Sequence, residues 1–232
     1  MGEADSPAPN RRTLALVGND IVDIRSTENL AQSSHPRLVQ RVLSQTEQIV
    51  LSSSAKHDLV FLAMWAAKEA AYKLLKKEQP ELIFAHSKFV VEGAEKTPDS
   101  KGTNCGAVTH SSGAVLCVTW EITRGWIHCI ARRLDNPTKY RALVRTLDAE
   151  LISGEFTERE LISVYSDQSR AVRTLAKIML RREGLIAPEI VRHPQQKRYS
   201  PPYIYDRGKR IYTCDLSLSH DGTHMAVVLA SE

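Results

Sequence analysis

The sequence of 232 residues lacks the features of several classes of protein. Its four cysteines form no C-x-x-C pair, which argues against a zinc site or a disulfide framework and favours reduced thiols. Its apolar runs are short and interrupted, so none is expected to span a membrane. The opening MGEADSPAPNRR is polar and contains proline, so residues 1–12 are expected to be a disordered lead and not a secretory signal. These absences favour a cytoplasmic protein with no membrane partner.

Aromatic residues are scarce, at 6%, and the charge is nearly balanced, with 31 basic and 27 acidic residues. A nucleic-acid-binding domain would show clustered basic charge with interleaved aromatics, so no nucleic-acid partner is expected. The formal net charge of +4 suits a partner that carries phosphate or carboxylate. A hydrophobic content of 42% is ordinary for a globular protein, and the length allows one large domain or two small ones.

The periodicity of apolar residues predicts an α+β fold made of two similar halves, residues 13–135 and 136–232. In the first half, strands are expected at 14–24, 84–92 and 113–133, helices at 37–50 and 61–77, and a loop at 96–106. A connecting helix is expected over 134–155, with the boundary between the halves near Asn136. In the second half we expect a helix at 166–185 with Ser166 or Asp167 as N-cap, a proline-rich loop at 192–210, and two strands joined across Asp221-Gly222.

Polar residues occupy expected apolar positions in the first strand and the second helix. Asp20 has the same parity as Val22, on the strand face that is expected to be buried. In the helix FLAMWAAKEAAYKLLKK, Lys68 falls within the apolar stripe and Glu69 at its edge, with Lys73 one turn beyond Glu69. Burying an unpaired charge is unfavourable, so these positions need an explanation.

A third unusual place is LSLSH, where Ser217 and Ser219 share one side of a strand and His220 lies at the turn. Each of the three features alone has a plain structural explanation. Asp20 could cap a turn or pair with a lysine, and the Glu-Lys pair has the order that is favoured on helix surfaces. A Ser-Leu-Ser strand is ordinarily just amphipathic, and a histidine at a turn is common.

Taken together, these residues fit a site for phosphate and a metal ion. Two carboxylates from different elements suit Mg²⁺, which takes one or two carboxylates together with waters and phosphate oxygens. Lysines hold phosphate as point charges, and hydroxyls and an imidazole add hydrogen bonds to the same anion. Phosphoryl transfer needs this combination of positioning and charge neutralisation.

The motifs GNDIVDI, WAAKEAAYK and SLSH, spread in this order along nearly the whole chain, resemble the 4′-phosphopantetheinyl transferase superfamily. Its small members, the holo-acyl-carrier-protein synthases, carry G-x-D-I-V-x-I, then F/W-x-x-K-E-x-x-x-K, then S-x-S-H. The chain is longer and is also similar to the surfactin-synthetase-activating type, a pseudo-dimer of two related α+β halves. In that type the S-x-S-H half comes first. The resemblance therefore implies a monomeric pseudo-dimer, circularly permuted or independently fused, with its site between the halves.

The resemblance implies Mg²⁺-dependent transfer of the 4′-phosphopantetheine arm from coenzyme A, as co-substrate, to a serine of an acyl or peptidyl carrier protein. Asp20 and Glu69 would be the metal ligands, with Glu69 also the general base. Lys73 would hold the pantetheine-side phosphate or the surroundings of the nucleophile, and Lys68 would support the phosphates. The residues implied for binding the rest of coenzyme A are Ser219, His220 and Arg170, with Arg173 as the alternate to Arg170.

Two positions depart from the family pattern. Val22 stands where the large type has a second acidic residue, although the small synthases also lack it and use water as ligand. The family's G-K-P loop aligns with YSPPYI, which has no lysine. Lys197, Arg198 or the basic residues at 207–210 could supply the missing charge.

The implied partner and the alternative function follow from the same comparison. Carrier domains of this kind are acidic around the modified serine, so a basic rim that includes Arg37, Arg41 and residues 181–198 is expected to meet them. The alternative is a degenerate member of the family that binds coenzyme A or a carrier protein without transfer. The missing lysine favours that alternative, whereas the retained Asp20 and Glu69 argue against it.

Overall fold

A computed structural model describes residues 16–96, 102–135, 139–195 and 198–231. The expected disordered lead at 1–12, the boundary near Asn136 and Lys197 lie outside the described residues. The fold is α+β, as predicted, with antiparallel sheets and helices.

The helices of the described residues are α1 (Thr27–Ser33), α2 (Pro36–Val42), α3 (Gln45–Ser53), α4 (His57–Glu78), η1 (His86–Lys88), η2 (Ala94–Lys96), α5 (Ala149–Ile152), α6 (Glu158–Leu161) and α7 (Asp167–Arg182). The strands are β1 (Val17–Asp23), β2 (Phe89–Glu92), β3 (Gly102–His110), β4 (Val115–Ile122), β5 (Trp126–Arg133), β6 (Lys139–Thr146), β7 (Pro188–Val191), β8 (Pro194–Gln195), β9 (Arg198–Tyr199), β10 (Tyr203–Asp206), β11 (Lys209–Arg210), β12 (Cys214–Asp221) and β13 (His224–Ser231).

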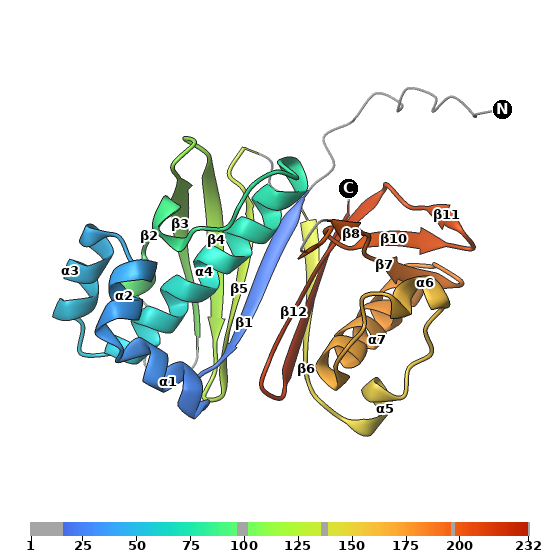
Figure 1. Cartoon of the computed structure of the whole chain (residues 1–232), viewed down its shortest axis with the longest axis horizontal. Helices are drawn as coiled ribbons and strands as arrows, with labels where there is room; N and C mark the ends of the chain where they lie inside the picture. Colours follow the sequence, from blue (N-terminus) through green and yellow to red (C-terminus); the bar gives the residue numbers. More distant parts are fainter. Residues whose placement is uncertain (1–15, 97–101, 136–138, 196–197, 232) are drawn as a thin grey trace.

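Two antiparallel sheets, each covered by one long helix, lie side by side (Figure 1). The first has the order β1-β5-β4-β3-β2 and carries α4, while the second has the order β12-β13-β6 and carries α7. Smaller sheets, β11-β10-β7 and β8-β9, flank the second. The edge strands β1 and β12 are in contact, so the seam between the two sheets lies along these strands.

Helix α4 packs closely on β1 because Gly18 has no side chain. A Cβ on Gly18 would lie 2.0 Å from the carbonyl oxygen of Ala70 and 2.9 Å from the amide nitrogen of Leu74. Both atoms belong to the backbone of α4, which is apolar and buried over most of its length. The glycine of the first motif therefore sets the distance between the helix and the strand, and Asp20 lies two residues further along the same strand face.

Replacing Gly18 by alanine is expected to destabilise the protein by about 1–3 kcal/mol, because the new methyl group overpacks a backbone contact that cannot yield without moving α4. Denaturant unfolding of Gly18→Ala against wild type measures this loss. Gly125→Ala is the matched control, since its Cβ would meet nothing closer than the His224 ring at 3.6 Å. Equal midpoints for both variants would mean that the close approach of helix and strand is not needed.

The second sheet and α7 follow the predicted pattern. Ser166 is the N-cap of α7, with its side chain accepting a hydrogen bond from the Ser169 amide, and Gly184 lies just beyond the helix with φ of +92°. The hairpin of β12 and β13 turns at Asp221-Gly222, where Gly222 has φ of +54°. A separate apolar cluster forms between α7 and this sheet.

Several predicted elements are wrong in type or extent. The helix expected over 134–155 is β6 followed by the short α5, because β6 pairs along its whole length with β13, a partner distant in sequence. The helix expected at 37–50 ends at Val42 and restarts at Gln45, where Ser44 and Glu47 form a capping box. Part of the expected loop at 96–106 is β3, and the loop at 192–210 contains four short strands.

Candidate functional site

Side chains of β12 accept hydrogen bonds from the outward-facing amides of β1. Three such bonds are formed: Val17 N to Asp215 Oδ2 at 2.8 Å, Asn19 N to Ser217 Oγ at 2.9 Å, and Asp23 N to Asp221 Oδ2 at 2.8 Å. The two residues of every pair are 198 positions apart, so the strands run parallel in one fixed register. Side chains thus replace a backbone ladder at the seam.

Asn19 fills the centre of this seam. Its fully buried amide nitrogen lies 3.3 Å from Ser219 Oγ and 3.1 Å from His128 Nε2. Burial, reinforced by the charge of Lys73, lowers the pKa of His128 to about 3, so that this histidine is neutral at physiological pH. The residue next to Asp20 in sequence therefore binds directly to the strand that carries Ser219.

Lys77 is a seam residue that the sequence interpretation missed. Its Nζ donates to the Val17 carbonyl at 2.7 Å, to Asp215 Oδ2 at 2.7 Å and to the Leu216 carbonyl at 2.8 Å. One lysine of α4 thus joins both edge strands. The sequence did contain a signal for this role, because Lys77 is four residues after Lys73 and residues i and i+4 share a helix face.

Asp20 and Lys73 form an ion pair between β1 and α4, with Nζ 2.8 Å from Oδ1. The Asp20 side chain is only 13% exposed, and burial raises the pKa of its carboxyl against the opposing effect of Lys73. The negative charge of Asp221, a second carboxylate of the seam, raises the pKa of Asp20 further.

Glu69 is one helical turn before Lys73, about 6 Å along the helix axis. Its Oε1 lies 3.8 Å from Nε2 of His86, and its side chain is 24% exposed. Burial, with the charges of Lys68 and Arg41, lowers the pKa of His86 to about 4. A neutral imidazole therefore accompanies this carboxylate at neutral pH.

Lys68, which was expected to support the phosphates, lies inside the protein and has protein partners. Its Nζ is fully buried and donates to Glu47 Oε2 at 2.7 Å and to the carbonyls of Val42, Phe89 and His86 at 2.8, 2.7 and 3.2 Å. Burial lowers the pKa of Lys68, and Glu47 opposes that shift. The lysine in the apolar stripe of α4 thus ties α2, α3 and the start of β2 to the helix.

Ser219 and His220 lie at the end of β12, the strand that contacts β1. Ser219 is buried against Asn19, whereas the His220 residue has exposed surface. Partial desolvation of the imidazole by surrounding protein lowers the pKa of His220, and the charges of Lys73 and Arg173 lower it further. The electrostatic contact between Lys73 and His220 joins α4 of the first sheet to the hairpin of the second.

Both arginines of α7 that the resemblance implied have hydrogen-bond partners within the protein. Arg170 donates to the carbonyls of Ile152 and Gly154 at 3.0 and 3.3 Å, which ties it to the end of α5 and the residues after it. The alternate, Arg173, is buried. Its Nη1 and Nη2 donate to Ser169 and Ser163, while its Nε has no hydrogen-bond partner among the described residues. Burial and the charge of Arg192 lower the pKa of Arg173 to about 10.

Arg192 is a further basic residue that the motifs did not indicate. Its Nε donates to the Ser200 carbonyl at 2.8 Å, in the loop that lacks the family's lysine. Burial lowers the pKa of Arg192, while Tyr72 of α4 is among the groups that oppose this shift across the seam. Cationic groups repel one another here, which is typical of a site that binds an anion.

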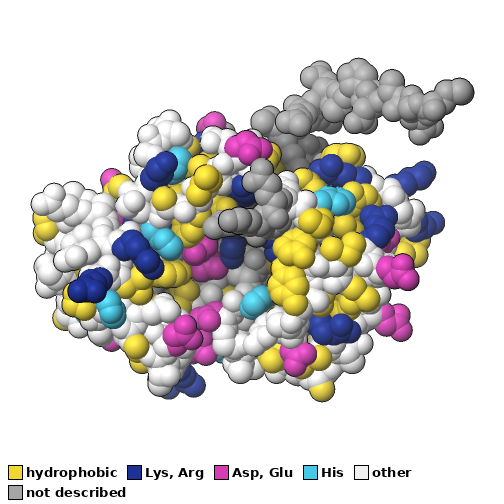
Figure 2. Space-filling view, in the orientation of Figure 1, with side chains coloured by type: hydrophobic (Ala, Val, Ile, Leu, Met, Phe, Trp, Pro, Cys, Tyr) yellow, Lys and Arg dark blue, Asp and Glu magenta, His cyan; other side chains and the backbone are white. Residues whose placement is uncertain are grey.

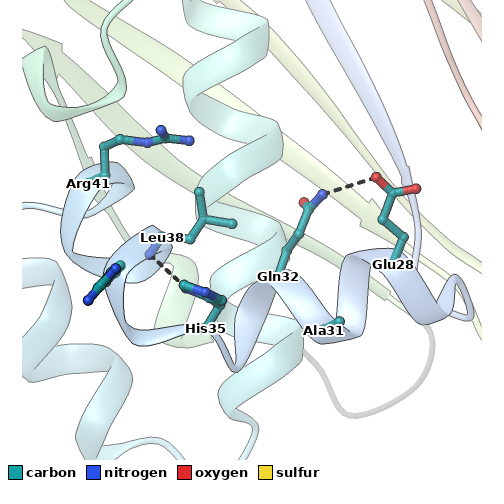
Figure 3. Close-up of a pocket in the computed structure, with 7 residues that line it drawn as sticks. Glu28, Ala31, Gln32, His35, Leu38 and Arg41 are labelled. Atoms are coloured by element: carbon teal, nitrogen blue, oxygen red, sulfur yellow. Dashed lines mark hydrogen bonds between the residues drawn. The ribbon is translucent and has the colours of Figure 1, made fainter.

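Basic, acidic and histidine side chains gather along the hollow between the two halves in the space-filling view (Figure 2). A separate surface pocket of about 410 Å³ lies on α1 and α2 (Figure 3). Its lining residues are Glu28, Ala31, Gln32, His35, Arg37, Leu38 and Arg41. The pocket thus contains Arg37 and Arg41, two of the basic residues that were expected to meet a carrier, and the charge of Arg41 acts on His86 beside Glu69.

Among the described residues, no group of three or more His, Cys, Asp or Glu side chains is arranged to hold a metal ion. In the same part of the chain, no helix is long and apolar enough to cross a membrane.

The model of the 4′-phosphopantetheinyl transferase superfamily matches residues 16–125. The matched segment contains Asp20, Glu69 and Lys73, while Ser219 and His220 lie outside it. No curated protein matches the chain. The similarity of this segment to the superfamily supports a transferase activity and phosphopantetheine transfer in general.

Proposed function

We propose that the protein transfers the 4′-phosphopantetheine group from coenzyme A to a serine of an acyl or peptidyl carrier protein in a Mg²⁺-dependent reaction of the holo-acyl-carrier-protein synthase type. The observation that carries the proposal is that β1, with the Asp20–Lys73 pair, and β12, with Ser219 and His220, are bonded side by side in one register. These residues come from opposite ends of the chain. A purely structural seam has no need of so many partly exposed charges beside it.

A magnesium ion would be held by one carboxylate of β1 and one of α4. Asp20 and Glu69 would hold it, and two carboxylates suffice for a metal that keeps waters and binds substrate phosphate oxygens. The raised pKa of Asp20 agrees with this arrangement, since burial and Asp221 leave the carboxylate short of positive charge even beside Lys73. Bound there, the ion would offset charge on the pyrophosphate of coenzyme A.

The chain's own side chains supply the other roles. Glu69 would take the proton from the carrier serine, directly or through a water. Lys73 and His220 would bind phosphate oxygens as point charge and hydrogen-bond donor, with Ser219 beside them. The 3′-phosphate would meet Arg170 or its alternate Arg173. In favour of Arg173, its charge acts on His220, and its Nε has no hydrogen-bond partner among the described residues.

Arg192 would replace the lysine that is absent from the YSPPYI loop. Its guanidinium is held by the Ser200 carbonyl of that loop. The side chain of Arg198 lies outside the described residues, as does Lys197, and Arg210 instead stacks on the rings of Tyr203 and Tyr212 at 4.0 and 4.7 Å. The hydrogen bond to Ser200 places the Arg192 guanidinium on the loop that lacks the lysine.

The pseudo-dimer, permuted or fused and acting as a monomer, is part of the proposal and is supported by a repeated buried ion pair. In the first half, Glu47 closes a capping box, accepts the Val91 amide at 2.8 Å and pairs with Lys68 of α4. In the second half, Glu160 closes a capping box, accepts the Ile190 amide at 2.8 Å and pairs with Lys177 of α7. Both Lys–Glu distances are 2.7 Å.

The proposed macromolecular partner is an acidic carrier protein in the cytoplasm. Arg37 and Arg41 of the α1–α2 pocket offer basic charge to such a partner, and the charge of Arg41 acts on His86, the neighbour of Glu69. The four cysteines are not disulfide-bonded, which agrees with a reducing compartment.

The test is arm transfer from labelled coenzyme A to a panel of purified apo carrier proteins from fatty-acid, polyketide and peptide synthesis, with Mg²⁺. Wild type is expected to label at least one carrier, and Asp20→Asn is expected to lose nearly all of this activity while remaining folded. Asp135→Asn is the matched control, because Asp135 is exposed and lies beyond the end of β5. Tight binding of coenzyme A without labelling of any carrier would overturn the proposal in favour of a binding protein.

A further inference from the structure

His86 lies beside Glu69 but belongs to another element. It begins η1, after the loop that follows α4, and its Nε2 is 3.8 Å from Glu69 Oε1. This nitrogen is buried and has no hydrogen-bond partner among the described residues. Buried polar atoms nearly always have a hydrogen-bond partner, so the lack of one for Nε2 among the described residues, beside a carboxylate, needs an explanation.

The His86 ring is held firmly in this place. It packs between Trp65 and Phe84, with ring centroids 4.7 and 4.2 Å away. Its backbone carbonyl accepts a hydrogen bond from the buried Lys68 at 3.2 Å. Lys68 and Glu69 are adjacent in α4, so one residue of the pair fixes the backbone of His86 and the next one faces its ring.

We propose that His86 is a positioning residue for Glu69: its Nε2–H faces the carboxylate in the free protein and donates a hydrogen bond to it when substrate and metal are bound. The inference rests on the proposed transfer reaction and names a residue that acts on its general base. The distance of 3.8 Å exceeds a hydrogen bond, but catalytic hydrogen bonds are commonly long before the substrate complex forms. A donor held by two aromatic rings fixes the orientation of the carboxylate without exchanging a proton with it.

A purely structural role for His86 makes a different demand on the side chain. For packing between Trp65 and Phe84, an apolar residue of similar volume would suffice, since both contacts are with ring faces and edges. To position Glu69, a side chain must place a hydrogen-bond donor at the location of the His86 Nε2 atom. Glutamine can place its amide nitrogen near that position, whereas the shorter asparagine places it near Nδ1.

The first experiment follows the ring nitrogens of isotope-labelled histidine by NMR in the full-length protein, with no carrier or coenzyme A. The His86 signal is assigned by its disappearance in His86→Gln. We expect its Nε2 to be protonated at neutral pH, and to shift in Glu69→Gln but not in Glu78→Gln, which changes another glutamate of α4. An unchanged His86 signal in Glu69→Gln would overturn the contact.

The second experiment compares steady-state transfer by three variants. His86→Leu and His86→Asn are expected to lower kcat by roughly 10–100-fold with little change in KM for coenzyme A, and His86→Gln to recover most of kcat. Equal activity of all three, with wild-type unfolding midpoints, would overturn the positioning role. Absence of transfer by wild type would instead reject the proposed function, and the NMR result would still decide whether His86 binds Glu69.

Discussion

Glu69→Gln is expected to lower kcat for arm transfer by roughly 10²–10⁴-fold, because an amide cannot accept the proton of the carrier serine. The amide is nearly the same size as the carboxylate, and Glu69 is partly exposed, so the unfolding midpoint should remain close to that of wild type. The measurement is the initial rate of labelling at saturating coenzyme A, carrier and Mg²⁺. Saturating metal separates the loss of the base from any weakening of metal binding.

Glu78→Gln is the matched control for this variant. Glu78 lies on the same helix and pairs with Arg133, away from the Asp20–Lys73 pair. Its activity should stay within a few-fold of wild type. A Glu69→Gln enzyme that retains wild-type kcat would show that another group removes the serine proton.

Lys68→Met is expected to destabilise the protein by about 3–5 kcal/mol, because it leaves the buried carboxylate of Glu47 without its cation. The carbonyls of Val42 and Phe89 lose a donor in the same change. Chemical denaturation of the purified variants gives the free energy of unfolding. The matched control is Lys96→Met, since Lys96 is exposed in η2 and its removal should change stability by less than about 0.5 kcal/mol.

The Lys68→Met variant also tests the phosphate role that the position of Lys68 in the motif implied. If Lys68 bound phosphate, its replacement would raise KM for coenzyme A and leave the unfolding midpoint unchanged. The buried position instead predicts a large loss of stability with little change in KM among the molecules that remain folded. A raised KM at full stability would contradict the structural role.

The sequence predicted elements whose signals are local. The strand around GNDIVDI, the helix α4, the capped helix α7 and the turn at Asp221-Gly222 each carry their own periodicity, cap or turn residues. Strand β6 was missed because its partner β13 is distant in sequence, and its own residues are mostly half-exposed and favour no single element. Its conformation is decided by pairing with that partner.

The same distinction applies to the site. The polar residues in apolar surroundings were correctly identified as unusual, but their partners could not be deduced from spacing. Lys68 was expected to bind phosphate, and its actual partner Glu47 lies 21 positions earlier. Arg170 and Arg173 are one turn apart on α7, and the choice between them depends on contacts with the segment after α5 and with Ser163.

The amides of β1 that bind β12 side chains have a consequence for any shortened form of the protein. In a fragment that stops before β12, the backbone amides of Val17, Asn19 and Asp23 would be unpaired hydrogen-bond donors on an exposed edge strand of the first sheet. Such an edge recruits strands from other molecules, so the fragment would be prone to self-association even though its own apolar cluster is complete. In the full chain, β12 covers this edge of β1 and thereby opposes aggregation.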